Sequence, residues 1–254
     1  MRVTVLGASP VRPNPGRACS GYLLEAEGRR YLVDCGAGVL ARLLCHADLA
    51  AIDAVVISHA HPDHCLDLVN VRQALAHAPG PRRPDPLPVY VGAAAHATIV
   101  RLGAAFADPS TAFWEPWIDF RVFDGTTTLT LDGVQAHVAP VRHYVPCWAI
   151  RFEHQDRVWV YTADSGPSDA LTLLAAGAHL VIGESTLPDR RGHEGAWGHM
   201  SAAEAAELAV AAGAERLVLT HYYAELAPAL LASAQQHAGG RPVDLAREGE
   251  VHVV

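Results

Sequence analysis

Short apolar segments separated by polar turns make up the first third of the chain, a pattern typical of β-strands. The strands that this pattern predicts lie at residues 3–6, 22–26, 31–33 and 54–57. Glu27-Gly28 separates the second of these strands from the third and predicts a tight hairpin. Helical apolar spacing at Leu40–His46 and Leu66–His77 predicts two helices in the same region.

The rest of the chain again alternates apolar segments with polar turns, after one segment rich in proline and glycine. Proline and glycine crowd Ala78–Pro88, which predicts an irregular loop before a strand at Val89–Val91. Further strands are predicted at 120–123, 129–131, 135–138, 149–152, 158–162, 180–182 and 217–219, and helices at 168–176, 202–212 and 226–237. The capping box Ser201-Ala202-Ala203-Glu204 marks the start of one of these helices, and Gly213 marks its end.

Two parts of the sequence show a weak internal similarity. Residues 31–58 read as a strand, an aspartate followed closely by glycine, a helix and a strand, and residues 160–184 follow the same order. If this internal similarity reflects a duplication, we expect two similar β/α halves that pack sheet against sheet with helices outside. Polar residues at the strand ends of both halves would then meet in one cleft.

Composition favours one sizeable globular domain. Half of the 254 residues are apolar, enough to bury about three quarters of the surface of the unfolded chain, so we expect a single domain over residues 1–254. The formal net charge is −8, and the chain contains arginine but no lysine. A large basic patch is therefore not expected, which weighs against tight, sequence-independent binding to nucleic acid.

The cysteines and apolar runs favour an intracellular setting. The five cysteines are scattered and form no Cys-x-x-Cys pair, so they read as buried or incidental thiols of a reducing compartment. The N-terminus lacks the long apolar core of a signal peptide, and no apolar run reaches the roughly 18 residues of a membrane span. We therefore expect a cytoplasmic protein with no membrane partner.

Three histidines and an aspartate lie within six residues, in the segment His59-Ala60-His61-Pro62-Asp63-His64, directly after a predicted strand. Buried histidine and aspartate cost free energy unless they find partners, so this cluster indicates a bound metal ion. Residues two apart in an extended segment point the same way, so His59 and His61 can hold one ion. Past the proline, Asp63 and His64 turn toward a second position. Nitrogen and oxygen ligands of this kind suit zinc best, with manganese, iron and cobalt as alternatives.

Three isolated residues extend this ligand set. His143, Asp164 and His221 each follow a predicted apolar strand. Any one of them alone reads more readily as a satisfied structural residue. Because the same arrangement recurs three times and a metal cluster already exists, we expect them to join that cluster in a two-ion site.

These residues resemble the metallo-β-lactamase superfamily, whose signature is His-x-His-x-Asp-His followed by a distant His, Asp and His. The resemblance covers nearly the whole chain and implies an αββα sandwich, with two sheets face to face and helices outside. It implies that one ion is held by His59, His61 and His143 and the other by Asp63, His64 and His221, with Asp164 bridging both. Asp34, in the segment Asp34-Cys35-Gly36, would orient the ligand loop.

Within the superfamily the chain is most similar to RNase Z and related phosphodiesterases. The similarity rests on four segments, at residues 5–9, 14–20, 184–186 and 198–201. It implies that Glu184 and His199 lie together and that His199 gives a proton to the leaving group. Two divalent ions would supply a bridging hydroxide for in-line attack on phosphorus. Asp63 is accordingly counted both as a ligand and as a catalytic residue.

The sequence also departs from RNase Z. Only twenty residues separate His143 from Asp164, room for one hairpin, whereas RNase Z enzymes usually carry there an arm that grips tRNA. Pro62 and Asp67 replace glycines that are usual in RNase Z. We therefore expect the substrate to be a small or cyclic phosphodiester or a short RNA.

Several alternatives stay open at this point. The same site suits the hydrolysis of esters, thioesters, lactones or lactams, and tRNA 3'-end processing is a further candidate. A nucleic-acid-binding protein without catalysis is disfavoured by the complete ligand set. The resemblance also leads us to expect a homodimer.

Two segments have undecided roles. Arg190 and Arg191 match the geometry of a substrate phosphate, but solvated loop charges are the preferred interpretation. The aromatic segment Phe113–Trp117 suits a wall for a nucleobase, a lid or a contact surface. For this segment we favour packing or an interface.

Overall fold

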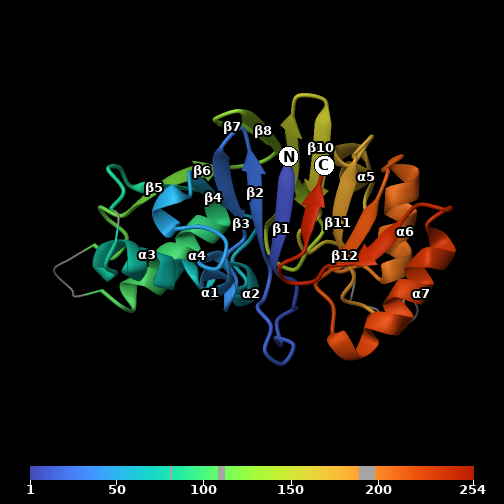
Figure 1. Ribbon diagram of the computed structural model, residues 1–254, viewed down its shortest axis with the longest axis horizontal. Helices are drawn as coiled ribbons and strands as arrows, with labels where there is room; N and C mark the ends of the chain where they lie inside the picture. Colours follow the sequence, from blue (N-terminus) through green and yellow to red (C-terminus); the bar gives the residue numbers. More distant parts are fainter. Residues whose placement is uncertain (81, 108–111, 189–197) are drawn as a thin grey trace.

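The computed structural model describes residues 1–80, 82–107, 112–188 and 198–254. Within these ranges the chain forms two seven-stranded sheets in the middle of the molecule, with helices on both outer sides (Figure 1). The αββα sandwich expected from the sequence is confirmed. In the described part of the chain, no helix is long and apolar enough to cross a membrane.

The first sheet has the strand order β14-β1-β2-β3-β4-β5-β6. Its strands are β1 (Arg2–Gly7), β2 (Gly21–Ala26), β3 (Arg29–Val33), β4 (Ala54–Ile57), β5 (Leu87–Gly92), β6 (Ile118–Phe123) and β14 (Val251–Val253). The strands from β3 to β6 pair in parallel, and the others pair antiparallel. As predicted, β2 and β3 form a hairpin around Glu27-Gly28, where both residues have positive φ.

The second sheet has the strand order β13-β12-β11-β10-β9-β8-β7. Its strands are β7 (Thr127–Leu131), β8 (Val134–Val141), β9 (Cys147–His154), β10 (Arg157–Tyr161), β11 (Leu180–Glu184), β12 (Leu217–Thr220) and β13 (Val243–Leu245). The strands from β10 to β13 pair in parallel, and β7 to β10 form an antiparallel meander. Each sheet therefore has a parallel half whose strand ends are available for a site.

Helices cover the outer face of each sheet. The first sheet carries α1 (Val39–Leu43), α2 (Pro62–Cys65), α3 (Leu68–His77) and α4 (Ala93–Ala104), and the second carries α5 (Asp169–Leu174), α6 (Ala202–Ala211) and α7 (Ala227–His237). Two short 3₁₀ turns lie at Leu49–Ala51 and Ala224–Leu226. The capping box at Ser201 is present at the start of α6, and Gly213 follows that helix with φ +67°, as predicted.

A large apolar core fills the space between the two sheets. It joins side chains of both sheets, among them Tyr22 of β2, Phe152 of β9 and Trp159 of β10. The rings of Phe152 and Trp159 stack with centroids 4.7 Å apart. Strands buried on both faces need apolar residues at nearly every position, which explains the continuous apolar runs in the sequence.

The structure corrects several predicted boundaries. The helix predicted at Leu66–His77 begins two residues later, as α3 at Leu68, and a separate short helix, α2, precedes it inside the metal cluster. The loop predicted at Ala78–Pro88 ends earlier than expected, since β5 begins at Leu87. The alanine-rich helix α4 and the two short strands β13 and β14 were not predicted.

The weak internal similarity between residues 31–58 and 160–184 corresponds to similar local structure. Tyr31–Val33 pairs in parallel with β4, and Trp159–Tyr161 pairs in parallel with β11. A short helix connects the two strands in each case. Asp34 and Asp164 therefore occupy corresponding places, just beyond the end of the first strand of each pair.

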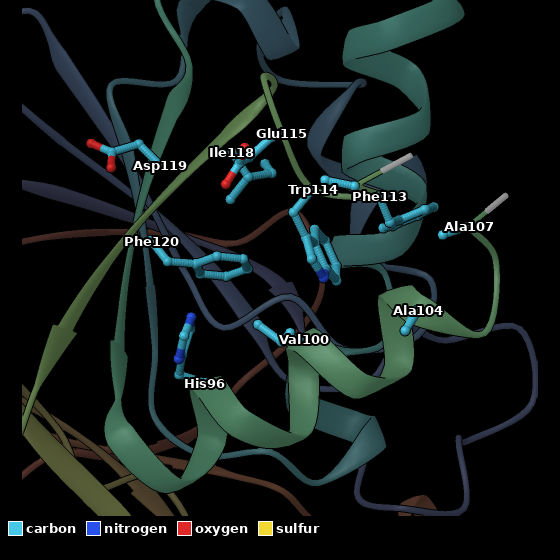
Figure 2. A pocket seen from close by; sticks show the side chains of 11 residues that line it. His96, Val100, Ala104, Ala107, Phe113, Trp114, Glu115, Ile118, Asp119 and Phe120 are labelled. Atoms are coloured by element: carbon cyan, nitrogen blue, oxygen red, sulfur yellow. The ribbon is translucent and has the colours of Figure 1, made fainter. Parts of the chain in front are cut away.

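The aromatic segment Phe113–Trp117 packs against the outer face of the first sheet. Phe113 and Trp114 are each 6% exposed, and a Cβ on Gly103 of α4 would lie 2.2 Å from Trp114 Nε1. Figure 2 shows Trp114 and Phe120 beside a cavity of about 550 Å³ between α4 and β6. The predicted metal ligands do not line this cavity. Phe113 and Trp114 therefore contribute to packing, which is the interpretation that we favoured for this segment.

Candidate metal centre

The predicted ligands lie where strands of both sheets end. His59 and His61 follow β4, and Asp63 and His64 lie on α2, which β4 leads into. From the second sheet, the site receives His143 after β8, Asp164 after β10 and His221 after β12. The backbone bends sharply at these ends, because Asp34, Ala163 and His221 have φ of +57°, +51° and +55°. Left-handed backbone at non-glycine residues is strained and is typical of functional sites.

A first group of ligand atoms combines three histidines with one carboxylate. His61 Nδ1 lies 3.1 Å from His59 Nε2 and 3.1 Å from His143 Nε2. Asp164 Oδ2 lies 3.8 Å from His59 Nε2 and 3.9 Å from His143 Nε2. Burial lowers the pKa of all three histidines. Neutral imidazoles offer the lone pairs that a metal ion requires.

A second group combines two histidines with two carboxylates. Asp63 Oδ2 lies 3.0 Å from His221 Nε2 and 3.6 Å from His64 Nε2. His64 Nε2 and His221 Nε2 lie 3.4 Å apart. Asp164 Oδ1 lies 3.3 Å from His64 Nε2 and 3.4 Å from His221 Nε2. Asp164 therefore contributes one oxygen to each group.

The charges of the second group suit a bound cation. Burial lowers the pKa of His64, but the carboxylates of Asp164 and Asp34 outweigh it and raise this pKa well above its ordinary value. Burial raises the pKa of Asp164, but His221 and His64 outweigh it and lower this pKa well below its usual range. Within the described residues, Asp164 Oδ1 is buried without a hydrogen-bond partner, a costly state unless a cation binds there.

Both groups fit a divalent metal ion. Zinc bonds of 2.0–2.1 Å in a tetrahedron require ligand atoms about 3.3–3.4 Å apart, and the separations given above run from 3.0 to 3.9 Å. Each group has four ligand atoms within 4.8 Å of one another. The residues present therefore fit two ions that share the carboxylate of Asp164.

Hydrogen bonds behind the histidines hold their rings in a ligand orientation. His143 Nδ1 donates to Gly198 O at 2.8 Å. Thr186 Oγ1 donates to His221 O at 3.0 Å, so it accepts from His221 Nδ1 at 2.6 Å. With Nδ1 protonated, the Nε2 lone pairs of His143 and His221 are available for metal. Partners of this kind tune the affinity of a metal site.

Asp34 orients the ligand loop, as expected. The fully buried Asp34 carboxylate lies 2.7 Å from His64 Nδ1. It also accepts hydrogen bonds from the backbone N–H and the hydroxyl of Ser58, both at 2.8 Å, and from Tyr161 Oη at 2.9 Å. Asp34 thereby links the end of β4 with α2 and β10.

Glu184 and His199 form a pair beside the two groups. His199 Nδ1 lies 2.8 Å from Glu184 Oε1, and the backbone N–H groups of Ser165 and Thr186 hold the two oxygens of Glu184 at 3.0 Å each. The His199 ring stacks on the His221 ring at 5.7 Å and meets the His143 ring edge-on at 5.0 Å. His199 thus touches one histidine of each ligand group.

The state of His199 suits a proton donor. Burial lowers the pKa of His199, but its hydrogen bond to Glu184 outweighs burial and raises the pKa to about 9. The Glu184 carboxylate therefore favours the protonated form of the ring. Because Nδ1 is engaged with Glu184, Nε2 is the nitrogen left to meet a substrate. The side chain of His199 remains 17% exposed.

The structure brings all the predicted ligands together with Glu184 and His199. Sequence reasoning assigned no role to the hydroxyl partners Ser58, Tyr161 and Thr186, because such residues are common and only the folded geometry reveals their hydrogen bonds. Arg190 and Arg191 lie outside the described residues.

Comparisons with known proteins identify the family of this chain. A family model described as a β-lactamase superfamily domain matches residues 29–222. A ribonuclease Z of Mycolicibacterium paratuberculosis is 33% identical over 254 residues, covering 93% of this chain and 89% of that protein. The probable metallo-hydrolase YhfI of Bacillus subtilis is 32% identical over 224 residues, covering 87% of this chain and 86% of that protein.

Solved structures show the same likeness. The crystal structure of YhfI from Bacillus subtilis aligns with a TM-score of 0.85 and 27% identity, covering 99% of both chains. The short form of human tRNase Z aligns with a TM-score of 0.77 and 21% identity, covering 100% of this chain and 99% of that one, a likeness of fold. The chain belongs to the β-lactamase superfamily and is a metal-dependent hydrolase.

Proposed function

We propose that the chain is a phosphodiesterase that holds two zinc ions and acts on small or cyclic phosphodiesters or short RNA. The observation that carries the proposal is the Glu184–His199 pair beside the metal ligands. Attack on an unactivated phosphodiester expels an alkoxide, which needs a proton as it leaves. His199 supplies a donor at that place.

Each residue of the site then has a chemical role. Two bound ions, when present, lower the pKa of a water and stabilise charge on the phosphoryl oxygens. Asp164 holds the two ligand groups in register through its two oxygens, and Asp63 completes the second group. Glu184 keeps the His199 ring in one orientation and favours its protonated form. His199 then delivers its proton from Nε2 to the leaving oxygen.

The shape of the chain favours a short substrate. The span between His143 and Asp164 is filled by the hairpin of β9 and β10, which leaves no arm for tRNA. The absence of lysine also disfavours a long polyanion. The relatives named ribonuclease Z keep tRNA 3'-end processing as a second candidate.

Four finer expectations belong to this proposal. The histidine and carboxylate donors favour zinc, with manganese and iron as alternatives. The core shared by the two sheets supports a single domain over residues 1–254. A homodimer is proposed from the resemblance, and a cytoplasmic location from the scattered cysteines.

Turnover of a substrate panel tests the proposal. Purified, zinc-loaded protein is assayed with cyclic nucleotides, cyclic ribose phosphates, linear dinucleotides and precursor tRNA, and in parallel with a thioester and a lactone. We expect chelator-sensitive hydrolysis of at least one small phosphodiester. Hydrolysis of the thioester or lactone with no phosphodiester turnover would overturn the proposal in favour of a carbonyl hydrolase.

A further inference from the structure

Tyr144 places an aromatic ring at the edge of the metal centre. The residue directly follows the ligand His143, and its ring lies 5.2 Å from the His143 ring and 5.7 Å from the His199 ring between centroids. The side chain is 49% exposed. Part of the residue therefore remains accessible to a substrate bound at the metal centre.

Gly198 makes room for this ring. A Cβ at position 198 would lie 2.8 Å from Cε2 of Tyr144, a contact too close for any other residue type without movement. The carbonyl of Gly198 also accepts the hydrogen bond from His143 Nδ1. Tyr144 is therefore seated between a metal ligand and the backbone that leads into His199.

The position of His199 defines which part of a substrate meets Tyr144. A leaving oxygen protonated by His199 Nε2 must lie within hydrogen-bond distance of that nitrogen. The Tyr144 ring centroid lies 5.7 Å from that of His199. A chemical group attached to the leaving oxygen therefore lies within reach of the Tyr144 ring.

We propose that Tyr144 stacks on a nucleobase carried by the leaving group, so that the substrate is a phosphodiester whose leaving oxygen belongs to a nucleoside. This proposal rests on the proposed phosphodiesterase function and narrows its substrate class. Stacking tolerates any base because every base has an aromatic face. The site would accept a nucleoside leaving group without reading its identity.

A four-way comparison of two proteins and two substrates tests this role. Wild-type protein and Tyr144→Ala are assayed with a dinucleotide and with its analogue that lacks the base on the leaving side, the leaving side being identified from the product that keeps no phosphate. We expect Tyr144→Ala to lower kcat/KM for the dinucleotide about tenfold and to leave kcat/KM for the analogue unchanged. Tyr144→Phe keeps the ring and should behave as wild type on both substrates.

A third substrate, abasic on the opposite side, serves as the matched control and should lose the same factor as the dinucleotide. Equal losses on all three substrates would show that Tyr144 only supports the fold of the site, and would overturn the stacking role alone. Unchanged kcat/KM of Tyr144→Ala on the dinucleotide would overturn it as well. If the zinc-loaded wild type cleaves none of the three but hydrolyses a thioester or lactone, the phosphodiesterase proposal fails, and the stacking role fails with it.

Discussion

Asp164 connects the two ligand groups through a single side chain, with one oxygen 3.8 Å from His59 Nε2 and the other 3.3 Å from His64 Nε2. His199 stands apart from this arrangement, because its Nδ1 is bound to Glu184 rather than directed to a metal position. At the residue scale the site therefore separates two tasks. One set of side chains holds metal, and one pair moves a proton.

This separation predicts a selective effect of His199→Ala. The variant should keep its full metal content but lose about 10²- to 10⁴-fold in kcat on a substrate with an alkoxide leaving group. A nitrophenolate leaving group needs no proton, so on such a substrate the loss should stay below about tenfold. Measured kcat for both substrates, together with metal analysis, checks this.

His96→Ala is a matched control, because His96 lies on α4 beside the cavity of Figure 2 and should change neither rate. A similar loss of kcat by His199→Ala on both substrates would show that His199 does not donate the proton.

The ligands were predictable from the sequence for a physical reason. Four of them share one short motif, and the other three follow apolar strands, so both spacing and position identify them. Their hydrogen-bond partners could not be predicted, since nothing local distinguishes Ser58 or Thr186 from other hydroxyl residues. The structure brings the ligands together, while the role of each residue remains a proposal.

At the element scale, the start of α6 fixes the segment that carries His199. Ser201 is 2% exposed, and its hydroxyl bonds both the backbone and the side chain of Glu204. Leu187 N–H donates to Met200 O at 3.0 Å. The helix start and this bridge together hold the two residues that follow His199.

Removal of the cap should therefore affect both stability and rate. Ser201→Ala should lower the free energy of unfolding by about 1 kcal/mol, equivalent to a fall in Tm of about 2–4 °C for a chain of this size, and should also lower kcat. Ser168→Ala removes the equivalent cap of α5, where Ser168 Oγ accepts from Leu171 N, and should lower Tm without changing kcat. Thermal melting and kinetics of both variants check this, and a Ser201→Ala protein with wild-type Tm would contradict it.

Elements were predictable where burial is continuous and unpredictable where it is not. Strands buried on both faces show as apolar runs, so most were found within a few residues. α4 was missed because its alanine-rich sequence lacks a clear polar face. Asp67 lies between α2 and α3, and its carboxylate accepts the N–H of Leu40 at 3.0 Å, a distant contact that leaves no local signal.

For the whole molecule, the metal centre joins the two sheets. His59, His61, Asp63 and His64 come from the first sheet and its helices, whereas His143, Asp164 and His221 come from the second. The clustered carboxylates and imidazoles are costly to bury together without cations. Bound ions should therefore stabilise the sandwich as well as catalyse.

Chelation should lower the thermal stability. Each ion present at about 1,000 times its Kd contributes about 4 kcal/mol, so Tm should fall by at least about 10 °C when a chelator removes both ions. Asp164→Asn weakens both ligand groups and should respond much less to the chelator. Equal Tm of the wild type with and without chelator would show that the metal centre does not stabilise the fold. Differential scanning calorimetry measures all four samples.

The most direct test of a two-ion phosphodiesterase is turnover as a function of bound zinc. Chelator-treated protein is titrated with zinc while hydrolysis of a small phosphodiester is followed, and the bound metal is measured at each point. We predict no turnover without zinc and a rate that keeps rising until two ions per chain are bound. Turnover without bound metal, or a maximal rate already reached at one ion per chain, would contradict the account.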